Sequence, residues 1–225
     1  MEKQQFLQHS TLNLQHSRSP RSRRFTLFTV NTVNPRRKIV TAAQQIHRRH
    51  GIDAVSMRSV AAAVGVTAPS LYRHFRDKEE LLGALVEAGH AQLEEYLAAP
   101  PPGPRRVSAM MRQFLRFAFD HTRLYELMFL SMRRAVRHFP EDFAAGKSRT
   151  FELLRQAVAE QMKGGAFRQD DPLETALTIW SHAHGLISMH ALGRFSGDQN
   201  AFAALYDRSL ERLLNGLQQS GRKKS

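Results

Sequence analysis

The chain of 225 residues contains no cysteine, so disulfide bonds, thiolate metal sites and a cysteine nucleophile are excluded. Acidic side chains are also few, because 20 Asp and Glu stand against 33 Lys and Arg and leave a formal net charge of +13. Long apolar runs are missing too, since no uninterrupted stretch approaches the roughly 20 residues that span a bilayer. We therefore expect a cytoplasmic protein that is not inserted in a membrane.

The excess of positive charge is concentrated towards the N-terminus. Residues 1–34 hold five Lys and Arg against one acid, and residues 35–82 hold nine against four, so these 82 residues carry +9 of the +13. A basic surface attracts nucleic acid, an acidic membrane surface or acidic proteins, and charge alone does not distinguish the three. The first 82 residues are therefore expected to face a polyanion.

Residues 1–34 show no sustained helical period and are dominated by Gln, Ser, Thr, Asn and Arg. An organelle transit peptide has a similar composition, but residues 25–33 alternate apolar and polar side chains and do not form a secretory hydrophobic core. We interpret residues 1–34 as a disordered basic extension, which either contacts DNA phosphates or is passive.

Four helices are expected over about residues 36–96. A helical period of apolar residues begins at Arg36, and Gly51 stands where a C-terminal cap is expected. Three polar residues stand where N-caps would start the next helices: Ser56, Thr67 and Asp77. The proline-rich run 99–104 then breaks any helix and predicts a turn before a separate helical region.

Beyond that turn the sequence predicts only helices. Amphipathic stretches cover residues 107–121, 124–137, 151–163, 172–192 and 201–217, with no convincing strand pattern between them. The expected fold class is therefore all-α.

Residues 56–75 have the pattern of a helix-turn-helix. Gly65 is the residue most tolerant of the positive φ that a tight turn needs. The apolar residues expected to fill the core between the two helices are Val60, Val66 and Leu71. The residues expected on the exposed face near the start of the second helix are Ser70, Arg73 and His74. A helix of this width fits the roughly 12 Å major groove of DNA with its first side chains at the base edges.

The same pair of capped helices also occurs in proteins that never bind DNA. In such a protein Tyr72 and His74 would be ordinary surface residues of an amphipathic helix. The motif alone leaves both interpretations open.

The residues from Gly51 to Leu82 resemble the DNA-binding domain of the tetracycline-repressor (TetR) family. The motifs that carry the resemblance are Ser56-Met57-Arg58, Gly65-Val66, Leu71-Tyr72-Arg73-His74-Phe75 and Lys78-Glu79-Glu80-Leu81-Leu82. The resemblance implies an N-terminal helix-turn-helix domain of three helices over residues 35–82, which binds DNA. It is joined to an all-helical ligand-binding and dimerisation domain over residues 83–225.

The resemblance also implies which side chains contact DNA. Seven are expected: Arg58, Pro69, Ser70, Tyr72, Arg73, His74 and Lys78. Arg58 would lie against a phosphate or a base edge, while Tyr72 and Lys78 would bind phosphates. The remaining four would face the major groove, whereas Leu71 and Phe75 would be buried.

Two segments of the C-terminal half, 119–129 and 180–185, resemble a branch of the same family whose ligand-binding domain bears a Trp-His-Gly signature. The signature is spread here, because three residues separate Trp180 from the His184-Gly185 pair. Six side chains are expected to bind an unknown small-molecule effector: Phe114, Tyr125, Met128, Phe129, Trp180 and His184. Stripes of Met and aromatic residues also occur as plain hydrophobic core, and this alternative stays open.

No metal site, cofactor or catalytic group is expected. His182, His184 and His190 lie close in sequence, but no two of them have the i,i+3 or i,i+4 spacing of a helical metal pair. His184 stands one helical turn beyond Trp180, which favours a core histidine or a hydrogen-bonding group in a cavity. Because no nucleophile–base pattern, phosphate loop or pair of carboxylates stands out, an enzyme is a disfavoured alternative.

These observations favour a homodimeric repressor that binds double-stranded operator DNA and is released by the effector. The apolar faces over residues 173–189 and 205–214 could pack within one chain, but the family resemblance implies that two helices of each subunit build a dimer interface. The second alternative is a constitutive helical protein that packages nucleic acid without sequence preference. The sequence names neither operator nor effector, and does not distinguish repression from activation.

Overall fold

The computed structural model describes residues 34–131 and 138–218, and every regular element in these ranges is an α-helix. Within them the β contact is a single isolated antiparallel bridge between Phe167 and Gln218. The all-α fold class expected from the sequence is confirmed. The predicted basic extension, residues 1–34, lies outside the described residues apart from Asn34.

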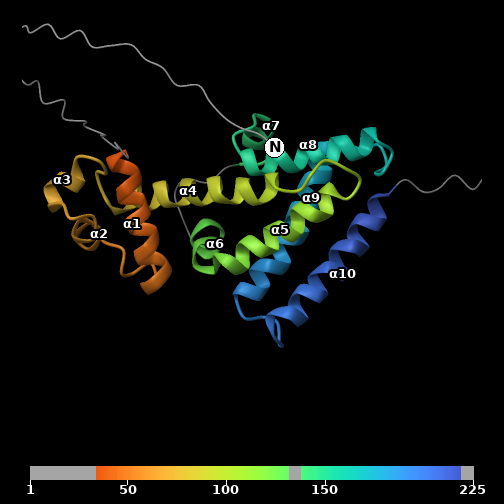
Figure 1. The fold of residues 1–225 in the computed structure, drawn as a ribbon. Helices are drawn as coiled ribbons and strands as arrows, with labels where there is room; N and C mark the ends of the chain where they lie inside the picture. The colour runs from red at the N-terminus through yellow and green to blue at the C-terminus, as the bar shows by residue number, and fades with distance from the viewer. Residues whose placement is uncertain (1–33, 132–137, 219–225) are drawn as a thin grey trace, which may run out of the picture. The chain divides into compact units, whose positions relative to one another are not determined.

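The helices follow the chain from α1 to α10 (Figure 1). The N-terminal helices are α1 Pro35–His50, α2 Met57–Val64, α3 Ala68–Tyr72 and α4 Lys78–Ala98. The C-terminal helices are α5 Arg106–Asp120, α6 Thr122–Phe129, α7 Glu141–Ala144, α8 Arg149–Lys163, α9 Pro172–Ala191 and α10 Gln199–Leu217. No helix among the described residues combines the length and the apolar character that a membrane span requires.

Side-chain caps set the ends of the helices around the predicted turn. The hydroxyl oxygen of Ser56 accepts from the backbone N–H of Ser59 at 3.0 Å, and the hydroxyl oxygen of Ser59 accepts from the N–H of Ser56 at 2.9 Å. Asp77 accepts from the N–H of Glu80 at 2.8 Å and so starts α4. Gly65 ends α2 with a left-handed φ of 77°, which a residue without a Cβ adopts readily. The predicted caps and turn are confirmed at these positions.

Two hydrophobic clusters hold the helices in place. The first joins α1–α3 to the first turns of α4, and its most buried members include Ile39, Val60, Leu71 and Phe75. Leu127 of α6 packs into the same cluster, so the N-terminal helices are anchored to the C-terminal part of the chain. The second cluster fills the space between the second half of α4 and the helices α5, α6, α8, α9 and α10.

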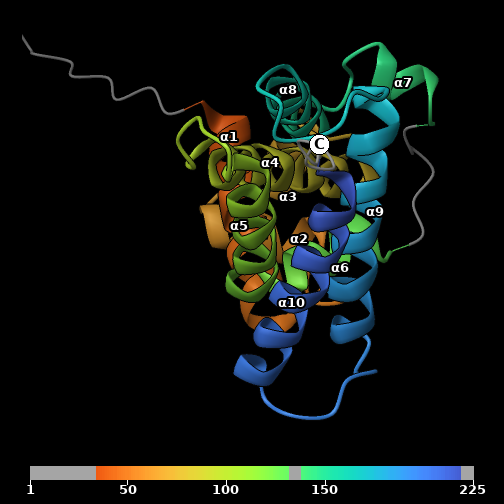
Figure 2. The ribbon, with the colours of Figure 1, turned by 90° about the vertical axis from the view of Figure 1, so that its right-hand side faces the viewer.

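α4 passes from the first cluster to the second without a break, across residues 82 and 83 between which we placed the domain boundary. The helices α5 and α8 pack on α4, and α9 packs on both α8 and α10. Figures 1 and 2 show α9 and α10 side by side. A single continuous helix therefore connects the predicted DNA-binding residues to the C-terminal helices.

Two expectations for the helix-turn-helix need correction. α3 ends at Tyr72, so Arg73 and His74 follow the helix instead of lying within it. Val66 is 37% exposed and is not a core residue. It completes the turn after Gly65, with its N–H bonded to a carbonyl of α2, and therefore lies on the inward face of neither helix.

The helix expected over residues 124–137 begins two residues earlier and ends at Phe129 as α6. Residues 132–137 of that prediction lie outside the described residues. The short helix α7 was not expected, because four residues are too few to show a helical period.

Candidate nucleic-acid interface and ligand cluster

The short helix α3 has one buried face and one exposed face. Thr67 caps its start by accepting from the N–H of Ser70 at 3.4 Å. The side chains of Leu71 and Phe75 are 0% and 1% exposed and fix the segment to the core, as expected. Tyr72 is 52% exposed, although it follows a fully buried neighbour. The buried face therefore holds α3 in place, while polar and aromatic side chains point outward from its exposed face.

The seven predicted DNA contacts lie in different environments. Four are exposed: Arg58, Pro69, Tyr72 and Arg73. Three are half-buried: Ser70, His74 and Lys78. Their contacts with DNA stay predictions.

Several of these polar groups are already held by neighbours within the chain. The guanidinium of Arg73 donates to the Ser70 hydroxyl at 3.1 Å, which orients both side chains along α3. The ammonium of Lys78 lies 3.5 Å from the carbonyl oxygen of Ile52, in the connection between α1 and α2. These side chains are partly positioned before any partner arrives.

Arg36 of α1 supports the end of the motif, a role that the sequence did not reveal. Its guanidinium donates to the carbonyl oxygen of His74, pairs with Glu80 at 3.1 Å and lies 4.0 Å above the centre of the Phe75 ring. The backbone N–H of Arg76 and the guanidinium groups of Arg36 and Arg76 lower the pKa of the Glu80 carboxyl to about 2. No local pattern indicates a contact between residues 38 positions apart.

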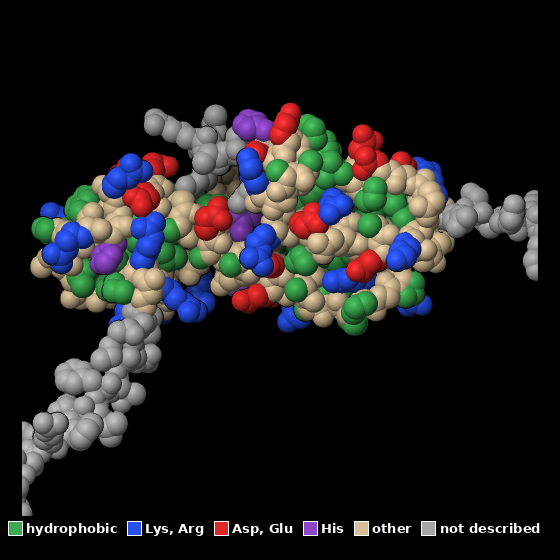
Figure 3. All heavy atoms as spheres, turned by 90° about the horizontal axis from the view of Figure 1, so that it is seen from above, with side chains coloured by type: hydrophobic (Ala, Val, Ile, Leu, Met, Phe, Trp, Pro, Cys, Tyr) green, Lys and Arg blue, Asp and Glu red, His purple; other side chains and the backbone are tan. Residues whose placement is uncertain are grey.

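Basic side chains surround this motif. Exposed Lys and Arg of α1 to the start of α4 are Arg36, Arg37, Lys38, Arg48, Arg49, Arg58, Arg73 and Arg76. Figure 3 shows blue Lys and Arg side chains over this part of the chain, at the left of the view, with a few acidic groups among them. Such a surface attracts a polyanion without selecting its sequence.

Five of the six predicted effector-binding residues meet in an aromatic cluster, formed by Phe114, Tyr125, Phe129, Trp180 and His184. The rings of Phe114 and Trp180 stack with their centres 4.5 Å apart, and the His184 ring lies edge to face with Phe129 at 5.0 Å. The sixth residue, Met128, packs against the same hydrophobic core from α6. The rings lie in direct contact, and their binding of an effector stays a prediction.

A polar chain runs through the aromatic cluster. The Tyr125 hydroxyl lies 3.0 Å from Nδ1 of His184 and 2.9 Å from the hydroxyl of Ser188. Burial raises the pKa of Tyr125 to about 12 and lowers the pKa of His184. Both groups are therefore neutral at neutral pH. Ser188 was missed by the sequence analysis, although its position one turn after His184 could have indicated it.

The apolar faces of α9 and α10 divide into buried and exposed parts. Leu210 and Leu214 are 0% and 8% exposed and pack within the chain. Met189 is 47% exposed, and Leu192, directly after α9, is 62% exposed. Part of the predicted dimer face is thus core of one subunit, and part is open to a partner.

Among the described residues, no group of three or more His, Asp or Glu side chains is placed to hold a metal ion. This includes the three histidines of α9, which were weighed as ligands on their spacing. His184 is taken up by Tyr125, while His182 lies 3.1 Å from the hydroxyl of Ser209.

Comparison with protein families matches both parts of the chain. Residues 39–85 match a family described as bacterial regulatory proteins, tetR family, and residues 107–215 match the tetracyclin repressor-like C-terminal domain. The chain belongs to the TetR family. It is therefore a DNA-binding transcriptional regulator, and responsiveness to ligands is typical of this TetR family. The Trp-His-Gly branch expected from the sequence stays a prediction.

Individual proteins resemble this chain in sequence or fold over most of its length. It is 26% identical over 185 residues to the HTH-type transcriptional repressor AcnR of Corynebacterium efficiens, which covers 80% of this chain and 94% of that protein. A solved protein of unknown function from a Rhodococcus species superimposes with a TM-score of 0.67 at 26% identity, covering 82% of this chain and 95% of that one. A TetR-family transcriptional regulator from Pectobacterium atrosepticum has the same fold, with a TM-score of 0.66 at 22% identity over 83% of this chain and 95% of its own.

Proposed function

We propose that this TetR-family regulator is a homodimeric repressor, which binds operator DNA through α2 and α3 and leaves it when a small molecule enters the aromatic cluster. The observation that supports DNA binding by this surface is that α3 has one buried face and one exposed face, which includes Tyr72. The similarity to a protein named as a transcriptional repressor favours repression over activation. Operator DNA as partner favours the cytoplasm as the place of action.

We assign residues 35–82 to the DNA-binding domain and residues 83–225 to ligand binding and dimerisation. Within the first, Tyr72 and Lys78 would bind DNA phosphates, and Arg58 would lie against a phosphate or a base edge. Pro69, Ser70, Arg73 and His74 would face the major groove. The hydrogen bond between Arg73 and Ser70 supports this, because it lowers the entropy lost when the two side chains become ordered on DNA.

The proposed effector is an apolar or amphipathic molecule without net charge. Its site would be lined by Phe114, Met128, Trp180 and their neighbours, with the neutral Tyr125–His184 pair as the polar contact. Since the rings touch one another, such a molecule has to separate them as it enters. Displaced helices would then change the distance between the two α3 helices of a dimer, so that they no longer match successive major grooves.

The test of the DNA-binding part is selection of duplexes from a random library with the full chain. A winning sequence with two-fold symmetry and half-sites about one DNA turn or somewhat more apart would support a specific dimeric regulator. The double variant Tyr72→Ala/Arg73→Ala should lose this sequence, while Lys163→Ala, an exposed charge at the end of α8, should keep it. Equal recovery of all duplexes would instead favour the nucleic-acid packaging alternative.

A further inference from the structure

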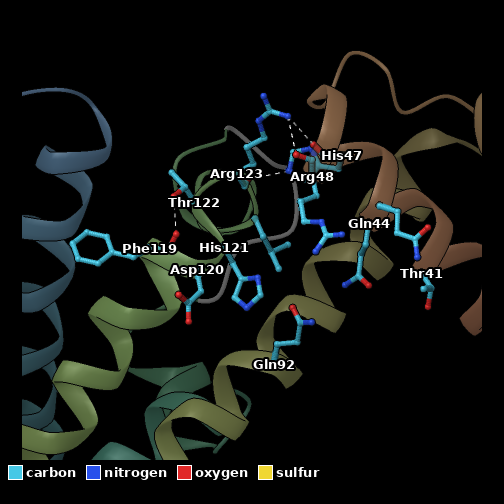
Figure 4. A pocket seen from close by; sticks show the side chains of 12 residues that line it. Thr41, Gln44, His47, Arg48, Gln92, Phe119, Asp120, His121, Thr122 and Arg123 are labelled. Atoms are coloured by element: carbon cyan, nitrogen blue, oxygen red, sulfur yellow. Dashed lines mark hydrogen bonds between the residues drawn. The ribbon is translucent and has the colours of Figure 1, made fainter. Parts of the chain in front are cut away.

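A cavity of about 380 Å³ lies where α1 meets the C-terminal helices (Figure 4). We call it the junction cavity; it is lined by residues 119–124 at the corner between α5 and α6, by Gln92 of α4, and by five residues of α1: Thr41, Gln44, Gln45, His47 and Arg48. Its volume is in the range of about 300–1,000 Å³ that is usual for small-molecule sites. None of the six residues predicted to bind the effector lines it.

Hydrogen bonds across one wall of the junction cavity hold a buried histidine in one orientation. His47 is 6% exposed, and its Nε2 lies 3.0 Å from the carbonyl oxygen of Arg123, which can only accept. Nε2 therefore donates to this oxygen, and Nδ1 is left for a second partner. The Arg123 guanidinium forms a second contact with α1 by donating to the carbonyl oxygen of Arg48 at 2.9 Å.

Two polar atoms of residues that line the junction cavity have no partner. Among the described residues, three buried side-chain polar atoms lack a hydrogen bond, and two of them are Nδ1 of His47 and Oε1 of Gln92. Both residues line the cavity, one from α1 and one from α4. Buried polar atoms without a partner destabilise a protein, so an occupant toward which the two side chains rotate would gain a hydrogen bond to each of them.

The charges around the junction cavity favour an anion. The Arg48 guanidinium forms no hydrogen bond or ion pair with another described residue, and Figure 4 shows its side chain among those that line the space. The one acidic group in the lining, Asp120, is engaged by the hydroxyl of Tyr96 at 2.8 Å and by Arg116 at 3.5 Å. The free charge that faces an occupant is therefore positive.

We propose that the junction cavity is a second ligand site, which binds a small anionic molecule carrying a hydroxyl or amino group. The anionic group pairs with Arg48, and the hydroxyl or amino group donates to Nδ1 of His47 and Oε1 of Gln92. The occupant thus bridges α1, which belongs to the predicted DNA-binding domain, and α4.

The ligand in the junction cavity regulates DNA binding, a consequence that rests on the proposed function. Because it contacts α1 and α4 together, it favours one arrangement of the two helices over others. Typical coupling between sites then changes operator affinity by about 5- to 150-fold, and operator DNA changes the affinity for the ligand by the same factor.

Titration calorimetry on the full chain tests the site without DNA. The probes are L-malate, L-glutamate and gluconate, which combine a carboxylate with a hydroxyl or amino donor; neutral glycerol and cationic putrescine are the controls. We expect heat of binding at millimolar concentration from at least one carboxylate and from neither control. Gln92→Met removes one acceptor at nearly constant volume and should weaken that binding at least about tenfold, the factor lost with one good hydrogen bond. The same substitution at an exposed position of α8, Gln156→Met, should leave the binding affinity as in the parent protein.

A second measurement separates the ligand site from a structural role of Gln92. Since its Oε1 is buried without a partner, Gln92→Met should raise the melting temperature of the ligand-free chain while it weakens binding. Absence of binding by all three carboxylates, or equal binding by the Gln92→Met variant, overturns the site. An operator affinity unchanged by a bound carboxylate overturns the coupling. Failure to bind any operator contradicts the proposed function, but calorimetry still decides on the site.

Discussion

Leu71 and Tyr72 are neighbours in sequence with opposite environments, one fully buried and the other half exposed. The difference arises because α3 packs on the core with a single face, so some of its residues hold the helix in place and others are available to a partner. Substitutions on the two faces should therefore act on different quantities: folding for Leu71, and binding for the residues around Tyr72.

Lys78→Ala should weaken binding to all DNA sequences about equally. If its ammonium neutralises one phosphate, removing it releases about one fewer counterion and flattens the dependence of log K on log salt by roughly one unit. Arg73→Ala should instead change which bases are preferred, at about 1–3 kcal/mol for a lost base contact. Binding measured over a series of salt concentrations and duplexes checks both. An unchanged slope for a folded Lys78→Ala protein would contradict its contact with phosphate.

Glu80 should make the stability of the N-terminal helices depend on acid. Its pKa is about 2 in the folded chain against an ordinary 4.5, because the N–H of Arg76 and the guanidinium groups of Arg36 and Arg76 favour the carboxylate. A lowered folded pKa gives stability that is present above pH 4.5 and is lost as the pH falls towards 2. The melting temperature of Glu80→Gln should therefore lie below that of the parent near neutral pH and approach it in acid.

The matched control for Glu80 is Glu79→Gln, an exposed neighbour on the same turn of α4. Its melting temperature should follow the parent across the whole pH series. A constant difference between the parent and Glu80→Gln from neutral pH to acid would show that the contacts of Glu80 do not depend on its charge.

At the scale of helices, the starts were predictable and several ends were not. Ser56 and Asp77 cap through bonds to residues three positions away, which a local pattern contains. Just after the end of α3, the guanidinium of Arg36 in α1 donates to the carbonyl oxygen of His74, a contact that no local pattern contains. Likewise, the pairing of His47 with Arg123 joins residues 76 positions apart, so the junction cavity was out of reach of sequence patterns.

Gly89 lies where side chains of α6 pack tightly on α4. A Cβ built at this residue would lie 2.6 Å from the sulfur of Met128 and 3.1 Å from a methyl carbon of Leu124. Gly89→Ala gains about 1 kcal/mol in helix propensity, but overpacking usually costs about 1–3 kcal/mol. We expect a net loss of about 1 kcal/mol in the free energy of unfolding, measured by denaturant titration.

Gly216→Ala in α10 provides the comparison for Gly89→Ala. A Cβ at residue 216 meets no atom within 4 Å, so this variant should be neutral or more stable by up to about 1 kcal/mol. Equal stability of the two alanine variants would mean that Met128 and Leu124 move aside without cost, and that α4 and α6 are not tightly packed at Gly89.

At the scale of the whole molecule, the sequence indicated the order of helices but not which apolar residues stay available for assembly. The leucines of α10 have the same spacing whether they face a partner or their own core, and only packing shows that Leu210 is fully buried. Met189 of α9, from the same predicted face, remains nearly half exposed. The pattern of a helix identifies its apolar side, whereas the neighbouring helices decide what covers it.

The protein should be a dimer at micromolar concentration in sedimentation velocity experiments. Met189→Glu places a charge on the exposed part of α9 and should raise the fraction of monomer without lowering the melting temperature of the monomer. Leu210→Ala should instead destabilise the subunit itself by about 2–5 kcal/mol, because it opens a cavity in the core. A parent protein that stays monomeric with and without operator would contradict the dimer.

Trp180 is the single tryptophan of the chain, and its ring stacks on Phe114 within the aromatic cluster. Indole fluorescence of this protein therefore originates from one place. A compound that separates these rings must alter the colour or intensity of the emission, whereas a compound confined to the junction cavity, whose lining contains no tryptophan, should leave the spectrum as it was. The unlabelled chain is thus an optical sensor of its own occupancy, and a fluorimeter can assign an unknown inducer to one of two locations before any complex is crystallised.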